Sequence, residues 1–274
     1  MPICTLCSFP LAKRSRPAHN LCMTRTILEI SGADRVSFLQ GLVSNDVARL
    51  EAGALVYAAL LSPQGKYLAD FFLVPLGDKI GVDVDSAQAA NLARRLSMYK
   101  LRADVAIAQS QLQVGRGLGD MPEGAFADPR DPALGWRRYA RDASDDASID
   151  WEALSVAHLV PQSGTDLVPD DSYILENRFE ALSGVDFRKG CYVGQEVTAR
   201  MKHKTTLKKG LARVRLEGAA QTGAEIVTEA GKPAGRLGTV SGHQALANLR
   251  FDRATGPLFA EGTALFAEGL PASE

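Results

Sequence analysis

The chain has 274 residues and a mass of 29.3 kDa, with 31 basic and 32 acidic side chains and a formal net charge of −1. Its apolar share of 46% and charged share of 23% are those of an ordinary globular protein and exclude general disorder. The near-zero net charge excludes a global field that attracts nucleic acid, so any site for RNA or phosphate must be a local basic patch.

The cysteine count and the apolar runs set expectations about location. Four cysteines in a chain of this length are too few for a disulfide scaffold and suggest a reducing compartment. No uncharged run approaches the roughly 20 apolar residues that span a bilayer. We therefore expect a cytoplasmic protein without a membrane segment, with the mitochondrial matrix as the alternative for a eukaryotic source.

The first 22 residues differ in composition from the rest. They contain three basic residues, three prolines and no acid. We interpret residues 1–22 as a disordered leader or as untranslated sequence ahead of a start at Met23, with a short organelle-targeting segment as the alternative. The leader contains ligand types of a zinc site at Cys4, Cys7, His19 and Cys22. Without structural context this match is weak, so we predict no metal site.

The residues after the leader predict an α+β region. Apolar runs predict strands over residues 26–30, 55–61, 67–75, 80–84, 105–108 and 112–115. The sequence Ser62-Pro63-Gln64-Gly65 is typical of the turn of a β-hairpin. Helices are predicted over residues 34–43 with Asp34 as N-cap, from Asp85 or Ser86 to Tyr99, and over residues 151–159.

The residues after Lys208 predict a different kind of domain. Five apolar-polar alternating segments, separated by Gly and Asp turns, occur at residues 211–216, 225–229, 235–241, 245–251 and 257–266. Five short strands without a helix indicate a small closed or sandwiched β-domain. We place the boundary near Thr205, so that an α+β region over residues 23–204 precedes a β-domain over residues 205–274.

The segment from residue 189 to residue 196 is the most informative in the chain. If a helix starts at Gly190, Cys191 lies in its first turn, where free N–H groups and the positive end of the dipole favour a thiolate. Lys189 adds a nearby cation with the same effect. The alternative interpretation is that Cys191 is a small buried apolar residue, because free cysteines are among the most buried residue types.

Helical spacing would gather further polar groups around this cysteine. Cys191 and Gln195 would share one face of the helix, and Tyr192 and Glu196 an adjacent face, because residues four apart are neighbours. A thiol, an amide and a carboxylate could then border one cleft. The alternative is that Glu196 is a solvated helix residue.

The same segment resembles a family signature. The sequence Lys189-Gly190-Cys191-Tyr192-Val193-Gly194-Gln195-Glu196 matches the Lys-Gly-Cys-Tyr-x-Gly-Gln-Glu motif of the YgfZ family, folate-binding proteins related to the T-protein (aminomethyltransferase) of the glycine cleavage system. Residues 32–47, 61–70 and 231–251 are similar to this family's N-terminal helix with its Thr-Asn-Asp turn, its hairpin and the closing strands of its barrel. The resemblance implies a T-protein-like ring, with two α+β folate-binding subdomains and a small C-terminal β-barrel around a central hole for tetrahydrofolate.

The resemblance also implies a function. It implies a folate-binding accessory factor for iron–sulfur cluster assembly or repair, with Cys191 as the reactive thiol. We expect Lys189 to be the second catalytic residue, because it places a cation next to that thiol. The partners would be iron–sulfur client proteins or the assembly machinery, with tRNA as a further candidate. The residues expected to contact tetrahydrofolate are Asn45, Asp70, Tyr192, Gln195, Glu196 and Arg200. The alternative is a folate-dependent one-carbon transferase involved in tRNA modification.

Two departures from the T-protein pattern bear on activity. T-proteins carry paired acids in the hairpin, whereas this chain has Ala69-Asp70. T-proteins bind the pterin through the Glu of an Arg-Leu-Glu-Ala-Gly segment, and the best match here, residues 155–159, has Ala157 in place of that acid. Alanine cannot accept the pterin's N–H donors. We therefore expect no aminomethyl transfer from glycine and leave open whether the protein is an enzyme.

A local basic patch accompanies the motif. Residues 188–209 contain seven basic residues and one acid, a net charge of +6 in a chain that is near neutral overall. Such a patch suits a polyglutamyl folate tail, RNA phosphate or an acidic partner. The alternative is a solvated strand edge whose lysines prevent aggregation.

Overall fold

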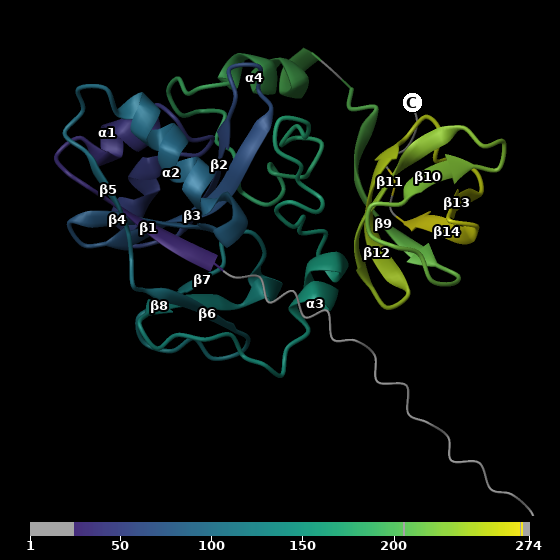
Figure 1. Cartoon of the computed structure of the whole chain (residues 1–274), viewed down its shortest axis with the longest axis horizontal. Coiled ribbons are helices and arrows are strands. Elements are labelled where there is room, and N and C mark those ends of the chain that lie inside the picture. The colour runs from purple at the N-terminus through teal and green to yellow at the C-terminus, as the bar shows by residue number, and fades with distance from the viewer. Residues whose placement is uncertain (1–24, 205, 269, 271–274) are drawn as a thin grey trace, which may run out of the picture.

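The computed structural model describes residues 25–204, 206–268 and 270. The leader interpreted at residues 1–22, with its candidate zinc ligands, lies outside the described residues. The described chain forms a five-stranded sheet, a three-stranded sheet and a closed barrel of six strands (Figure 1). The predicted α+β class with a C-terminal β-barrel is therefore confirmed.

The five-stranded sheet contains five of the six strands that the apolar runs predict. Its members are β1 (Arg25–Ser31), β2 (Val56–Leu61), β3 (Tyr67–Leu76), β4 (Lys79–Asp85) and β5 (Ala106–Gln109), in the order β2-β3-β4-β1-β5. Strand β2 is buried on both faces: Ala58 and Leu60 pack in one apolar cluster, and Ala59 and Leu61 in another. Burial of both faces explains why β2 and β3 read as continuous apolar runs rather than as alternating ones.

Three helical elements accompany this sheet. They are α1 (Arg35–Gln40), the 3-10 helix η1 (Val47–Ala52) and α2 (Ser86–Lys100). The cap predicted at Asp85 is confirmed, since its carboxylate accepts from the Ala87 amide at 2.9 Å. Asp34 occupies the N-cap position of α1, as predicted, but its carboxylate makes no capping hydrogen bond and instead accepts from the Asp104 amide at 2.8 Å. The helix ends at Gln40 rather than at residue 43.

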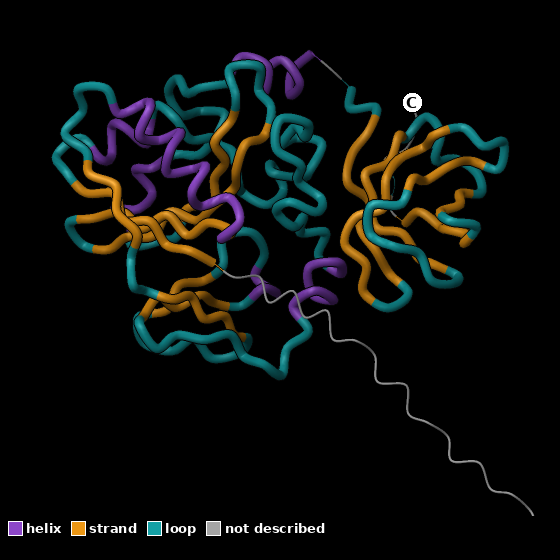
Figure 2. The backbone as a smooth tube through the Cα atoms, in the orientation of Figure 1, coloured by secondary structure: helices purple, strands orange, loops and turns teal. Residues whose placement is uncertain are grey.

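The middle of the chain forms the small sheet and one further helix. The sheet contains β6 (Gln113–Gly117), β7 (Ala125–Ala127) and β8 (Trp136–Ala140) in the order β6-β8-β7, with the 3-10 helix η2 (Pro132–Leu134) before β8. Helix α3 (Trp151–Ala157) confirms the helix predicted over residues 151–159. A long irregular segment then leads to α4 (Gln195–Lys204). Figure 2 shows these loops between the five-stranded sheet and the barrel.

The barrel contains one strand more than predicted. Its strands are β9 (Lys209–Leu216), β10 (Glu225–Thr228), β11 (Pro233–Ser241), β12 (Gln244–Arg250), β13 (Leu258–Ala260) and β14 (Thr263–Glu268). The single strand predicted over residues 257–266 is wrong, because Glu261 and Gly262 have positive φ angles of 50° and 81° and turn the chain between two paired strands. Closure of the barrel removes its sheet edges.

The barrel is fixed to the irregular segment by a buried carboxylate. Asp166 accepts hydrogen bonds from the Thr239 amide at 2.9 Å and from its hydroxyl at 2.6 Å. Gly238 permits this approach, because a Cβ there would lie 1.8 Å from the Asp166 carboxylate. A second link runs from the Leu211 amide to the Glu176 carbonyl at 2.8 Å. None of the helices in the described ranges is both long and apolar enough to cross a bilayer.

Candidate functional site

Cys191 lies in a loop before α4, with its side chain exposed. The helix predicted from Gly190 is wrong, since α4 begins at Gln195. Gly194 explains the late start: its φ is +83°, and a Cβ there would lie 2.6 Å from the Ser62 carbonyl oxygen. Cys191 therefore does not lie in the first turn of a helix. Cys191 with Gln195, and Tyr192 with Glu196, are not neighbours on a helix face either, because Cys191 and Tyr192 precede α4. The alternative interpretation of a buried cysteine is also wrong.

Lys189 anchors the loop that carries this thiol. Its side chain is buried, and Nζ donates to the carbonyl oxygens of Gln40 at 2.9 Å, Val43 at 2.6 Å and Asn45 at 2.9 Å. Burial lowers the pKa of Lys189 to about 8, while Asp46 and Asp186 act in the opposite direction. Because three backbone oxygens use the three N–H donors, Lys189 holds the loop in position rather than offering a free ammonium group.

Asn45 has an equally internal role. Its amide Nδ2 donates to the carbonyl oxygens of Tyr57 at 2.8 Å and Ser183 at 2.7 Å, and its Oδ1 accepts from the Asp46 amide at 2.9 Å. The neighbouring Ser44 hydroxyl donates to the Gly184 carbonyl at 2.6 Å. The Ser-Asn-Asp turn therefore ties strand β2 to the segment that leads into the motif.

The predicted residues after the cysteine divide between the core and the solvent. Tyr192 is buried in an apolar cluster, and burial raises the pKa of its hydroxyl. Gln195 accepts a long hydrogen bond of 3.4 Å from the Tyr192 amide. Glu196 is 88% exposed and pairs with Arg200 at 2.9 Å, one helical turn away. Glu196 and Arg200 therefore lie on the solvent face of α4, as the solvated alternative holds.

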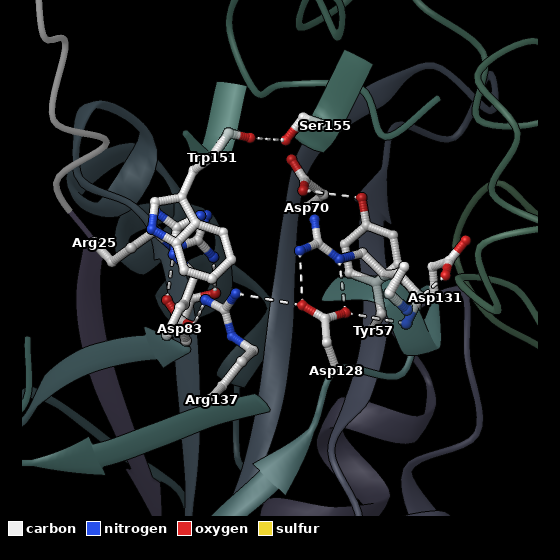
Figure 3. A network of polar contacts seen from close by, with 12 residues as sticks. Arg25, Tyr57, Asp70, Asp83, Asp128, Asp131, Arg137, Trp151 and Ser155 are labelled. Atoms are coloured by element: carbon white, nitrogen blue, oxygen red, sulfur yellow. Dashed lines mark hydrogen bonds and ion pairs between the residues drawn. The ribbon is translucent and has the colours of Figure 1, made fainter. Parts of the chain in front are cut away.

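Asp70 is buried, and its carboxylate accepts hydrogen bonds from three hydroxyl groups. It accepts from Tyr57 at 3.0 Å, from Tyr67 at 2.7 Å and from Ser163 at 2.6 Å. Burial and, after it, the charge of Asp70 raise the pKa of both tyrosines well above the ordinary value, so they remain neutral donors. Figure 3 shows Tyr57 pointing at this carboxylate.

The six residues predicted to hold tetrahydrofolate do not form one site. Asn45 and Asp70 use their polar atoms on internal partners, Tyr192 is in the core, and Glu196 and Arg200 pair with each other in solvent. Tyr57 connects two of the six, because its carbonyl accepts from Asn45 and its hydroxyl donates to Asp70. This residue set does not fit a bound pterin.

Sequence reasoning missed a buried ion network. Asp83 pairs with Arg25 and with Arg137, each at 2.7 Å, and Arg137 lies 3.6 Å from Asp128 (Figure 3). Burial by itself raises the pKa of Asp83, but the two guanidinium groups outweigh it and lower the pKa to about 2. The network joins β4 to β8 and thereby the two sheets. The signal in the sequence was a single acid inside the apolar run of residues 80–84.

The basic patch is partly neutralised by nearby acids. Lys202 pairs with Glu180 at 2.6 Å, and Lys209 pairs with Glu176 at 3.2 Å. With Lys189 buried, the patch is less charged than its composition predicts. Arg188 and Lys204 are exposed and lie on either side of the motif in the sequence. Within the described residues no group of three or more His, Cys, Asp or Glu side chains could hold a metal ion.

Comparison with known proteins identifies the fold and the family. The solved aminomethyltransferase T of the glycine cleavage system from Bartonella henselae superposes with a TM-score of 0.70, covering 90% of this chain and 83% of that one at 14% identity. The similarity confirms the expected T-protein-like fold. Residues 208–271 match the family model of the CAF17 C-terminal beta-barrel domain.

Three relatives are named as mitochondrial iron–sulfur cluster assembly factor IBA57 or its homolog. The Mus musculus protein is 30% identical over 89% of this chain and 82% of its own length, and the Homo sapiens protein 31% over 85% and 78%. The Mycosarcoma maydis protein is 32% identical over 68% of this chain, which spans 54% of that longer relative. The resemblance inferred from the motif is therefore confirmed in part: this chain belongs to the IBA57/CAF17 family, which is related to YgfZ but not the same.

Proposed function

We propose that this protein is an iron–sulfur cluster assembly factor that acts through the exposed thiol of Cys191. Two findings together support the proposal: the family of the chain and the exposed position of Cys191. The relatives are named as iron–sulfur cluster assembly factors, and the motif loop presents its cysteine to solvent. The Cys191 thiol would contact the cluster or the protein that carries it.

The arrangement of the loop suits such a contact. The bonds of Lys189 to three carbonyl oxygens and the burial of Tyr192 hold the residues on both sides of Cys191. A cysteine on a fixed loop loses little conformational freedom when a partner binds. One thiolate cannot hold a cluster that takes four ligands, so the other ligands would come from a partner protein.

The same relatives suggest which partner the protein binds and where in the cell it acts. Proteins of the assembly machinery are the proposed partners, and the exposed cations Arg188 and Lys204 suit an acidic surface on them. The relatives are named as mitochondrial, which favours the mitochondrial alternative over the cytoplasmic expectation for a eukaryotic source.

Complementation tests the thiol. A strain that lacks its own family member would receive the wild type, Cys191→Ala or Glu196→Gln, and the activity of a four-iron enzyme would be measured. We expect Cys191→Ala to lose rescue at unchanged protein level and Glu196→Gln, five residues away and exposed, to keep it. Equal rescue by all three would refute the role of the thiol.

Tetrahydrofolate is kept as a ligand to be tested rather than as part of this mechanism. The reason to test it is the aminomethyltransferase fold. The residues predicted to contact folate do not converge on one site, so the proposed role of the thiol does not involve folate. Saturable binding of tetrahydrofolate that survives Asp70→Asn and Tyr192→Phe would place folate at other residues. Transfer of a one-carbon unit to tRNA stays a prediction, which tRNA analysis of the complemented strains would test.

A further inference from the structure

A cleft of about 310 Å³ lies between the barrel and the irregular segment that precedes the motif. One wall is the outer surface of β9, β11 and β12, and the other consists of residues 165–176. Its walls are held apart at a fixed spacing, because Asp166 bonds to Thr239 and the Glu176 carbonyl to the Leu211 amide. A preformed cleft of this volume is at the small end of the range for ligand sites, about 300–1,000 Å³.

The barrel wall of this cleft is cationic. Arg250 lies directly opposite Lys209 in the β12–β9 ladder, and Arg236 directly opposite Asn248 in the β12–β11 ladder. Asn248 and Arg250 are two residues apart on one strand, so all four side chains share one face. Arg253, in the turn after β12, completes the wall.

Two cations of this wall already have acidic partners. Lys209 and Arg250 lie directly opposite each other, but Lys209 pairs with Glu176 at 3.2 Å and Arg250 with Asp252 at 3.0 Å. The guanidinium groups of Arg236 and Arg253 donate to backbone carbonyls, those of Gly223 at 3.3 Å and Pro233 at 2.6 Å. A bound carboxylate would give Arg236 and Arg253 a charged partner and match the fork geometry of their guanidinium groups.

The opposite wall is acidic. Glu176 is buried, and burial raises the pKa of its carboxyl, while Lys209 and Lys66 lower it and Asp171 adds a smaller repulsion. Asp171 is exposed at the rim of the cleft. Lys209 bridges to Glu176 at 3.2 Å and is the contact between the two charged walls. An ammonium group in the cleft would be attracted by the carboxylates of Asp171 at the rim and Glu176 on the wall.

We propose that this cleft binds a small zwitterion of amino-acid size. Its carboxylate lies against Arg236, Arg250 and Arg253 on the barrel, and its ammonium group against Asp171 and Glu176 on the facing segment. A simple anion would meet the acids of one wall and a simple cation the arginines of the other, so only a ligand with both charges satisfies both. The site is separate from Cys191 and does not depend on the function proposed above.

Calorimetric titration of the full chain tests the proposal with matched probes. L-Glutamate and glutarate have the same two carboxylates, and glutarate lacks the ammonium group. We expect L-glutamate to bind saturably with a Kd below about 10 mM. Glutarate should bind at least about tenfold more weakly. Glycine and L-lysine, titrated in parallel, report which side chain the cleft accepts.

Variants locate the binding. Arg236→Gln and Glu176→Gln each remove one wall's charge and should weaken L-glutamate binding by about tenfold or more. Arg215→Gln, on β9 but outside the cleft, serves as the control and should bind as the wild type does. Circular dichroism and melting temperature show whether each variant is folded. The proposal is overturned if none of the three amino acids binds below about 10 mM, if glutarate binds as well as L-glutamate, or if folded Arg236→Gln binds as tightly as the wild type.

Discussion

The ammonium group of Lys189 donates to the backbone oxygen of Val43 at 2.6 Å, although 146 positions separate the two residues in the chain. Through this bond and two like it, the cysteine loop is attached to the connection between α1 and η1. The lysine of the motif thus has a structural role beside the exposed thiol, which its position next to Cys191 in the sequence does not reveal.

Replacement of this lysine should loosen the loop. In Lys189→Met, three buried carbonyl oxygens lose their donor, and unsatisfied polar groups cost about 1–3 kcal/mol each. We expect the free energy of unfolding, measured by urea denaturation, to fall by about 3 kcal/mol or more. Lys204→Met, on the exposed end of α4, is the control and should change stability by less than about 0.5 kcal/mol. Equal stability of both variants would contradict the anchoring role.

Two glycines of the motif should respond differently to alanine. Gly194 has φ of +83° and a close carbonyl neighbour, whereas no atom lies within 4 Å of a Cβ added at Gly190. We expect Gly194→Ala to cost about 1–3 kcal/mol through backbone strain and steric overlap, and Gly190→Ala to be near neutral. Urea denaturation of both variants measures the difference. A neutral Gly194→Ala would mean that the loop can leave the hairpin at little cost.

Neighbouring arginines of β8 provide a second matched comparison. Arg137 is 2% exposed and faces Asp83 and Asp128, while Arg138 pairs with Asp142 at the surface. Arg137→Met removes one of two guanidinium partners from each of the buried carboxylates Asp83 and Asp128, which keep Arg25 and Arg130, and should cost about 3 kcal/mol. Arg138→Met should cost less than about 1 kcal/mol. Thermal and chemical denaturation of the two variants would reveal whether the network is essential to the fold.

The folded protein should lose stability in acid as the Asp83 carboxylate becomes protonated. The pKa of this carboxyl is lowered from an ordinary 3.8 to about 2, so its stabilising effect is complete above about pH 4 and is lost as the pH falls toward 2. The shift corresponds to about 2 kcal/mol. We expect stability to fall between pH 4 and pH 2 more steeply in the wild type than in Asp83→Asn. Parallel pH profiles of the two proteins would show that other carboxylates account for the acid sensitivity.

The surface pair on α4 should matter little for stability. Glu196 and Arg200 are exposed, and ion pairs of this kind contribute about 0.3–0.5 kcal/mol. Glu196→Gln should therefore unfold at nearly the wild-type urea concentration. A loss of complementation at unchanged stability would identify Glu196 as a contact to a partner, whereas a large loss of stability would show that α4 depends on this pair.

The sequence by itself determined the local elements, because their signals lie within a few residues. The β2–β3 hairpin follows from two apolar runs around Ser62-Pro63-Gln64-Gly65, and α2 from its cap at Asp85 and its apolar spacing. The barrel strands follow from alternation, although the sharp turn at Glu261 and Gly262 was hidden within a mostly apolar run. The motif at residues 189–196 singled out the functional region for the same reason: its residues are adjacent in the chain.

Only the tertiary structure decided what those motif residues do. The hairpin turn packs against Gly194 and delays the start of α4, which leaves Cys191 on a loop rather than at a helix terminus. Whether Lys189 is free or bonded, and whether Asp70 can accept a ligand, depends on partners between 3 and 149 positions away in the chain. Burial and hydrogen bonding of a polar group are set by packing between distant segments, and residue types at short spacing carry no record of that packing.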